Sequence, residues 1–315
     1  MVGVVEEVEM GVAVAVEVDV VIEIDEVGEV EVGVVRVAVN DLRIDSAPIS
    51  ITVGFLQENI NKMCDWTSTW LMSLNTDKCK FLEIGNNLGN HNYTLNTQGN
   101  TTTISRVTME KDLGVTIDNQ LKFTAQCNAA ALKANRMLGI VFRTFTYMSP
   151  TMFITLYKTL IRPHLEYATT IWSPMLTRDK ITLENVQRRA TKRIPSIKNL
   201  SYSERIKKLG LPSLEYRRNR ADVIQVYKIL NKIDILDQTI MFRELTGIAT
   251  RGHSKKLFKK RFRLNSTGNF FSNRVINTWN SLSEEVVTSP TLNCFKSRLN
   301  KLWVNHPTKF RPTFY

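Results

Sequence analysis

The chain has 315 residues, of which 42 are Lys or Arg, 30 are Asp or Glu and 43% are hydrophobic. This length suggests roughly two domains, and the apolar fraction is too high for a chain that is disordered throughout. No apolar run of about 18 residues occurs, so we expect no membrane-spanning helix. The acidic N-terminus does not fit a secretory signal, and the four cysteines are widely spaced. Together these features favour an intracellular, reducing compartment, without distinguishing nucleus from cytoplasm.

The charge is divided unevenly along the chain. Residues 1–50 contain 12 acids and only two bases, so residues 51–315 contain 40 bases and 18 acids. A strongly basic body favours a polyanion as the binding partner, and nucleic acid is the polyanion that we expect.

The first segment, residues 1–50, has low complexity and consists mainly of Val, Glu, Asp, Gly and Ala. Valines alternate with small or acidic residues between Val12 and Val20, which is the period of a β-strand. The composition is nevertheless that of a simple repeat. We therefore expect this segment to lack a stable fold, and its role, if any, is left open.

Residues 51–122 form the second region, for which the pattern predicts a small α/β piece. Apolar residues three and four positions apart predict an amphipathic helix over 55–74. The residues of that stripe are Leu56, Ile60, Met63, Trp66, Trp70, Leu71 and Leu74. We expect a strand over 78–84, a hairpin around Gly99 that joins residues 93–97 to 101–107, and a further strand over 113–117.

Residues 123–233 form the third region and are helical in pattern from about Thr124 onward. An apolar stripe of Leu132, Leu138, Val141, Phe142 and Phe145 marks its first helix. Later helix boundaries are marked by Ser149-Pro150 as a start, by a capping box over 201–204, by Gly210 as a stop and by a long helical pattern over 214–230.

Residues 234–315 form the fourth region, a basic C-terminal extension. Its first part, 234–265, is irregular in pattern, and two short helices are predicted over 271–282 and 292–303. The whole chain is therefore predicted to belong to the α+β class with helix dominant.

Motifs for catalysis are sparse. Two-metal phosphoryl transfer requires carboxylates that converge on a pair of cations, and polymerases usually supply two adjacent Asp residues. The chain contains no Asp-Asp, and Gly85 to Gly89 lacks the Lys-Ser/Thr of a P-loop. We therefore expect neither a metal site nor a bound cofactor in this chain.

Three basic clusters carry the strongest functional pattern. They are Arg188-Arg189-x-x-Lys192-Arg193, Arg217-Arg218-x-Arg220, and Lys255-Lys256-x-x-Lys259-Lys260-Arg261-x-Arg263. Residues three and four apart on a helix are neighbours, so the first two clusters concentrate charge on a helix face. The third is interleaved with Leu257, Phe258 and Phe262, which either stack on bases or anchor the segment. A solvated helix face explains any single cluster equally well, but three in one basic body favour nucleic-acid binding.

Several further motifs follow one another in order along the chain. They are Trp66-x-x-x-Trp70-Leu71-Met72-Ser73-Leu74-Asn75-x-x-Lys78-Cys79-Lys80, Glu110-Lys111-Asp112-Leu113-Gly114-Val115-x-Ile117-Asp118, Leu160-Ile161-Arg162-Pro163-His164-Leu165-Glu166-Tyr167-Ala168, Trp172-Ser173-Pro174, Gln187-Arg188-Arg189-Ala190-Thr191-Lys192, Leu200-Ser201-Tyr202-x-Glu204-Arg205 and Phe270-Phe271-Ser272-x-Arg274-Val275-x-Asn277-x-Trp279-Asn280-x-Leu282. As an ordered set, these motifs resemble the C-terminal part of reverse transcriptases from non-LTR retrotransposons of the jockey-like kind. The resemblance covers residues from about 55 to 303.

The resemblance implies a partial palm with primer-grip-like strands over 51–122, a helical thumb over 123–233 and a C-terminal extension over 234–315. It also implies that the catalytic Asp-Asp turn of the family belongs shortly before the helix near residue 55. The repeat occupies that place here, so the chain resembles a reverse transcriptase cut off from its active centre. Mg²⁺ is expected only for the intact family enzyme.

Single residues are carried over where a motif matches. Lys78 falls at the Asn-x-x-Lys position, which in the family assists the departing pyrophosphate, and it is the only possible remnant of a catalytic set. By the same resemblance, Leu113, Gly114 and Val115 would press against the primer terminus. The thumb bases Arg188, Arg189, Lys192 and Arg193 would contact the backbone of a template–primer duplex.

These observations lead to one expectation and two alternatives. We expect a fragment of an RNA-directed DNA polymerase that binds RNA or an RNA/DNA duplex but does not polymerise. A basic architectural module and a retrotransposon remnant without function stay open as alternatives. The sequence does not decide whether RNA or DNA is preferred. It also leaves open the oligomeric state and the existence of a separate polymerase portion.

Overall fold

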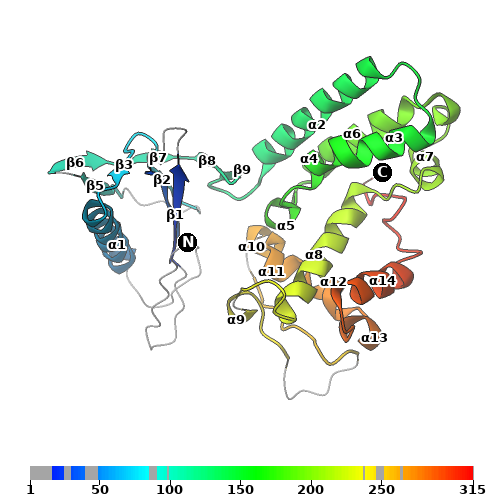
Figure 1. Cartoon of the computed structure of the whole chain (residues 1–315). Helices are drawn as coiled ribbons and strands as arrows, with labels where there is room; N and C mark the ends of the chain where they lie inside the picture. Colours follow the sequence, from blue (N-terminus) through cyan, green and yellow to red (C-terminus); the bar gives the residue numbers. More distant parts are fainter. Residues whose placement is uncertain are drawn as a thin grey trace. The chain divides into compact units, whose positions relative to one another are not determined.

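A computed structural model describes most of the chain. The described residues are 16–24, 30–39, 49–84, 91–97, 99–236, 238–245, 252–262 and 265–314. They belong to two compact units, residues 1–121 and 122–315, which are treated separately below. Short strands lie in the first unit and helices make up most of the second (Figure 1). The predicted class, α+β with helix dominant, is confirmed.

The first unit begins with two antiparallel strands, β1 (Val16–Ile24) and β2 (Val30–Val39). Strand β3 (Ser73–Leu74) extends this sheet by pairing in parallel with β2. The strands lie where valine alternation has the β period, although we expected the segment over 1–50 to lack a stable fold. Residues 1–15 of the repeat lie outside the described residues.

Helix α1 (Ile49–Thr69) is displaced toward the N-terminus relative to the predicted helix over 55–74. It ends at Thr69, and Leu71 then takes a left-handed conformation with φ 55°. The buried stripe consists of Leu56, Ile60 and Cys64. Trp66 and Trp70 are instead 43% and 66% exposed, so their place in the predicted apolar face is wrong.

The predicted hairpin around Gly99 is present. Strands β5 (Thr94–Thr97) and β6 (Asn100–Thr103) pair antiparallel, and Gly99 has φ 81°, a value that favours glycine. The second predicted strand is interrupted at Ile104, whose buried side chain joins the core of this unit. Beyond it, β7 (Ser105–Val107) pairs in parallel with β4 (Lys80–Leu82), which is shorter than the strand predicted over 78–84.

A second hairpin replaces the single strand predicted over 113–117. Strands β8 (Met109–Asp112) and β9 (Val115–Asp118) pair antiparallel, with Asp112 opposite Val115. The two residues between them, Leu113 and Gly114, have φ 43° and 83°. Positive φ at both central positions is the geometry of a tight primed hairpin turn, which explains why a glycine stands here.

The second unit opens with α2 (Thr124–Thr144), which begins at the predicted residue. Its buried face contains Cys127, Ala130, Ala131, Ala134, Leu138 and Val141. Leu132 is 53% exposed, so the predicted stripe is correct only in part. Helix α3 (Pro150–Leu156) has the predicted start, because the Ser149 hydroxyl accepts a hydrogen bond from the Met152 N–H at 3.2 Å.

A π-helical stretch (Tyr157–Ile161) leads into α4 (Arg162–Glu166), and α5 (Thr169–Trp172) follows. The next long helix is α6 (Thr177–Lys192), followed by a 3-10 turn (Pro195–Ile197).

Helix α7 (Tyr202–Lys208) has the predicted capping box, in which Ser201 and Glu204 exchange backbone and side-chain hydrogen bonds. Gly210 follows it with φ 59°, and α8 (Leu214–Leu230) has the predicted bounds.

The C-terminal elements share a hydrophobic core with α8. They are α9 (Gln238–Met241), α11 (Phe271–Arg274), α12 (Ile276–Asn280), α13 (Glu284–Val287) and α14 (Leu292–Leu302). The short helix α10 (Asn265–Asn269) precedes α11 and contributes no residue to this core. The helix predicted over 271–282 is thus divided into α11 and α12. Tyr227 of α8 stacks on Phe295 of α14 at 4.2 Å between ring centroids, and Trp279 of α12 is fully buried beside them. Within the described part of the chain, every helix is too short or too polar to cross a membrane.

Candidate nucleic-acid interface

The C-terminal half of α6 carries an exposed group of four bases, Arg188, Arg189, Lys192 and Arg193, called here the α6 cluster. The other side of the same helix is fully buried, with Leu183, Val186 and Ala190 at 0% exposure. Helical spacing therefore separates a packing face from a charged face, as the sequence predicted.

Helix α2 packs beside α6 (Figure 1) and positions part of the cluster. The Arg189 guanidinium donates to Asn135 Oδ1 at 3.2 Å, and the Arg193 guanidinium carbon lies 4.6 Å from the centroid of the Phe142 ring. Contacts of this kind hold long basic side chains against the helix pair and reduce the entropy lost on binding an anion.

The two helices expose bases and no acids. Three further bases, Lys133, Arg136 and Arg143, are exposed on α2, which contains no Asp or Glu. The two acids of α6, Asp179 and Glu184, are 2% and 0% exposed. Both helices lie wholly within the described residues, so their joint surface has a positive potential that no carboxylate of either helix neutralises.

A buried polar network fixes α6 in place beneath that surface. Gln187, which is 1% exposed, accepts a hydrogen bond from the Tyr157 hydroxyl at 2.8 Å and donates to the Tyr202 oxygen at 3.0 Å. The Tyr202 hydroxyl in turn donates to Glu184, which also accepts from the Leu214 N–H at 3.0 Å. These bonds join α6 to α7, to α8 and to the π-helical stretch.

Burial dominates the ionisation of Glu184. Desolvation raises the pKa of its carboxyl from 4.5 to about 7, although hydrogen bonds from Tyr202 and Leu214 act in the opposite direction. This carboxyl therefore helps to hold α6 in place and does not reduce the positive charge of the exposed surface.

The extended segment over 252–262 is a second exposed basic region. Lys259, Lys260 and Arg261 are exposed, and Lys255 and Lys256 are half-buried. Leu257, at 0% exposure, anchors the segment, and its backbone exchanges hydrogen bonds with the Asn280 side chain at 2.9 and 2.8 Å. Phe258 and Phe262 are 42% and 40% exposed, so each ring keeps an accessible face beside the bases.

Two predicted phosphate-binding residues on α8 are not part of an exposed cluster. Arg217 forms an ion pair with Glu166 through two of its nitrogens, and the pair is about three-quarters buried. Arg218 is 4% exposed and lies inside the second unit. The i, i+3 spacing of the α8 bases predicted a charged surface, but this part of the helix packs against α4 to α6, so the expectation of exposure was wrong for Arg218.

The residues carried over by resemblance in the first unit lie on two separate turns. The Lys78 side chain is exposed in a turn after β3, where the Lys78 N–H bonds to Asn75. Leu113 is 75% exposed at the tip of the β8–β9 hairpin, and Val115 is 3% exposed at its base. Gly114 has no side chain, so its backbone is open at the same tip.

The resemblance implies Mg²⁺ for the intact enzyme, and carboxylate oxygens are the protein ligands that this ion requires. Among the described residues, the structure brings no group of three His, Cys, Asp or Glu side chains together at one place. No step that requires such a metal is derived for this chain.

Sequence reasoning missed the contribution of α2 to the basic surface. It was visible in the sequence, because no Asp or Glu occurs between Asn119 and Leu165 while Lys133, Arg136 and Arg143 fall within that stretch.

No family model, no curated protein and no solved structure matches the chain.

Proposed function

We propose that this chain binds nucleic acid by contacts to backbone phosphates, chiefly through the α6 cluster and the exposed bases of α2. One observation carries the proposal: two packed helices expose several bases and no acid. Phosphate contacts of this kind supply most sequence-independent affinity, and arginine forks are well suited to them.

The segment over 252–262 supports the same function by a different chemistry. Exposed Phe258 and Phe262 stand among lysines, a combination that allows bases of a single strand to stack while the cations contact phosphates. We place this segment second, because Lys259 already donates to Asn277 at 3.1 Å and Lys255 to Asn231 at 3.3 Å.

The resemblance to reverse transcriptases adds a direction to the proposal. In that view residues 123–233 of the second unit correspond to the thumb, which tracks a template–primer duplex, and the Leu113–Gly114 turn corresponds to the primer grip. An RNA/DNA duplex is therefore the ligand of choice, and the chain is proposed not to polymerise because its sequence has no Asp-Asp pair.

A matched pair of double variants tests the binding surface. Arg188→Gln with Lys192→Gln removes two charges from the α6 cluster, one helical turn apart. Lys232→Gln with Lys301→Gln removes the same charge from exposed positions outside α2 and α6. Titration of a labelled RNA/DNA duplex should show weaker binding for the first variant and near-parental binding for the second. Equal losses in both variants would show that only net charge matters and would contradict the proposed surface.

Primer extension tests the catalytic part of the proposal. The purified chain is incubated with a primed RNA template, deoxynucleotides and either Mg²⁺ or Mn²⁺. We expect duplex binding without extension, and template-dependent synthesis would refute the proposed inactivity.

A further inference from the structure

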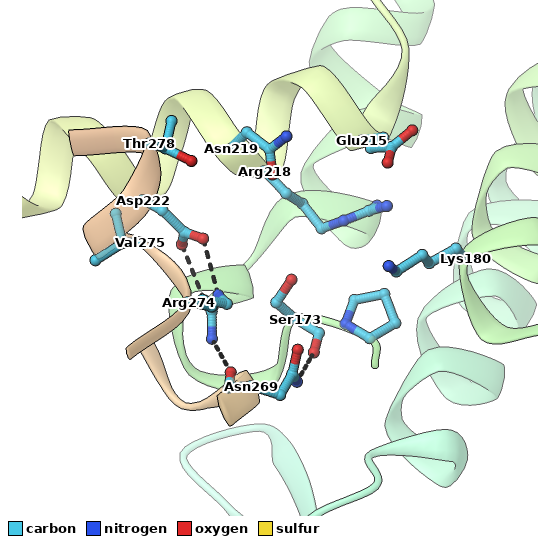
Figure 2. Close-up of a pocket in the computed structure, with 11 residues that line it drawn as sticks. Ser173, Lys180, Glu215, Arg218, Asn219, Asp222, Asn269, Arg274, Val275 and Thr278 are labelled. Atoms are coloured by element: carbon cyan, nitrogen blue, oxygen red, sulfur yellow. Dashed lines mark hydrogen bonds and ion pairs between the residues drawn. The ribbon is translucent and has the colours of Figure 1, made fainter. Parts of the chain in front are cut away.

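A small polar cavity lies inside the second unit, away from the exposed α6 cluster on the surface of the same helix. Its volume is about 180 Å³, and it is lined by residues of α6, α8, α10, α11 and α12 (Figure 2). Three cationic side chains line this cavity: Lys180, Arg218 and Arg274.

Arg218 is the exceptional residue of the cavity. Its side chain extends from α8 toward Lys180 and Glu215, as Figure 2 shows. The residue is 4% exposed, and neither terminal nitrogen, Nη1 nor Nη2, has a hydrogen-bond partner among the described residues. A guanidinium keeps its charge in proteins, so an arrangement without an acceptor is costly.

The carboxylates around the cavity are bound to other donors. Asp222 accepts two hydrogen bonds of 2.9 Å from Arg274. Glu215 accepts from the N–H and the hydroxyl of Thr313, at 2.8 and 2.6 Å. Glu184 belongs to the network under α6. The ion pair of Arg274 is thus complete. The charges of Glu184, Glu215 and Asp222 act on Arg218 from nearby, but none of these carboxylates accepts a hydrogen bond from its terminal nitrogens.

Lys180 adds a second charge to the same side of the cavity. Figure 2 shows its ammonium directed toward the Arg218 guanidinium. Burial lowers the pKa of both groups, and the charge of Arg218 lowers the pKa of Lys180 further, while the carboxylate of Glu215 acts in the opposite direction on both. Two like charges that face a common space favour an anion between them.

We propose that this cavity binds a phosphate-type oxyanion between Arg218 and Lys180. A tetrahedral oxyanion presents several acceptors, and a guanidinium can donate two parallel hydrogen bonds to it. Buried water would satisfy the donors but would place no negative charge between the two cations. The inference goes beyond duplex binding, because no residue of the α6 cluster lines the cavity.

Free inorganic phosphate and the phosphate of a nucleoside monophosphate share the recognising chemistry. The experiment therefore has two arms, in which inorganic phosphate or adenosine monophosphate is titrated into the full chain in chloride buffer at constant ionic strength. Binding is followed by ³¹P NMR line broadening and by the midpoint of thermal unfolding. Binding in the first arm identifies the free ion as sufficient, and binding in the second arm alone identifies a monoester. No binding in either arm overturns the proposal.

Variants separate the cavity from general salt effects, since phosphate also stabilises proteins by exclusion from their surface. We expect Arg218→Met to weaken phosphate binding at least tenfold and to remove the phosphate-dependent rise in melting temperature. Lys301→Met removes the same charge from an exposed position on α14, outside both the cavity and the α6 cluster, and should keep both responses. An equal response in Arg218→Met and the parent would contradict the proposal. If Arg218→Met does not fold, Lys180→Met at the half-buried rim gives the same decision.

Discussion

The two units of this chain are built in different ways. The first unit surrounds a small core, to which α1, β4 and β5 contribute, with sheets of two or three short strands. The second unit packs helices around a core that joins α8 to α12 and α14, and it buries charged and polar groups inside hydrogen-bond networks.

The difference shows which elements depend on distant partners. Helices α8 and α14 of the second unit have their own side-chain caps, Ser213 and Thr291, whereas a strand such as β4 exists only through its pairing with β7, more than twenty residues away in the chain. We therefore expect the second unit to be the more stable one, with slower amide hydrogen exchange than residues 75–120.

The largest effect is expected in the core of the second unit. Trp279 is fully buried, donates from Nε1 to the Lys255 carbonyl at 2.7 Å and lies beside Phe295. Trp279→Ala should lower the free energy of unfolding by about 4 kcal/mol, because it leaves a large cavity. Trp66→Ala, at a position 43% exposed in the first unit, should cost less than about 1 kcal/mol. Urea titration measures the free energy of unfolding of both variants, and similar losses would contradict the expected difference between the two units.

The next effect concerns the buried acid of the network under α6. The pKa of Glu184 is about 7 in the folded chain and 4.5 in the reference state, so the folded state binds its proton more tightly. Its contribution to stability is full below about pH 4.5 and is lost as the pH rises through 7. Above pH 7 the free energy of unfolding of the parent chain should be lower by about 3 kcal/mol for this reason. Glu184→Gln cannot ionise, so this decrease should be absent from the variant. Urea unfolding midpoints measured from pH 4 to 8 test this, and an equal decrease in parent and variant would contradict the role of Glu184.

Two glycines give effects of opposite sign. Gly114 has φ 83° in the β8–β9 turn, so Gly114→Ala should destabilise the first unit by about 1–2 kcal/mol. Gly139 lies within α2, and nothing stands within 4 Å of where its Cβ would be. Gly139→Ala should stabilise the second unit by about 0.5–1 kcal/mol. Thermal unfolding followed by circular dichroism measures both, and a stabilising Gly114→Ala would show that the turn geometry is wrong.

An effect similar in size to that of the glycine substitutions is expected at the cap of α7. Ser201→Ala removes the hydroxyl that accepts from the Glu204 N–H, and should cost about 1 kcal/mol. Thr155→Ala is the matched control, because that exposed hydroxyl bonds only within α3. A larger loss in the control than in Ser201→Ala would contradict the role of the cap.

Many helix boundaries of the second unit could be predicted because they are set by particular residues close to each helix end. Ser149-Pro150, the Ser201–Glu204 box and the bounds of α8 require only residues within one helical turn of the boundary. The strands of the first unit could not be placed with the same precision. The break at Ile104 depends on a contact outside its own strand, since the Ile104 N–H donates to the Tyr93 carbonyl at 2.8 Å. The turn at Leu113-Gly114 is local, but it requires a left-handed conformation at Leu113, which a leucine rarely adopts.

The candidate site divides in the same way. Periodicity placed the α6 cluster on an exposed face, because the opposite face of α6 is plainly apolar. The same spacing misled for Arg218, since α8 is packed on most of its circumference and both Arg217 and Arg218 turn inward. Helical spacing tells which residues share a face, but only the neighbouring helices decide whether that face reaches solvent.

The salt dependence of duplex binding tests the central claim most directly. For the full chain bound to an RNA/DNA duplex, the account predicts that the logarithm of the association constant falls linearly with the logarithm of salt concentration, with a slope of about −3 to −4 for roughly four phosphate contacts. The Arg188→Gln, Lys192→Gln variant should lose about 2 from the magnitude of that slope. A slope near zero for the parent chain, or an identical slope in the variant, would contradict the account.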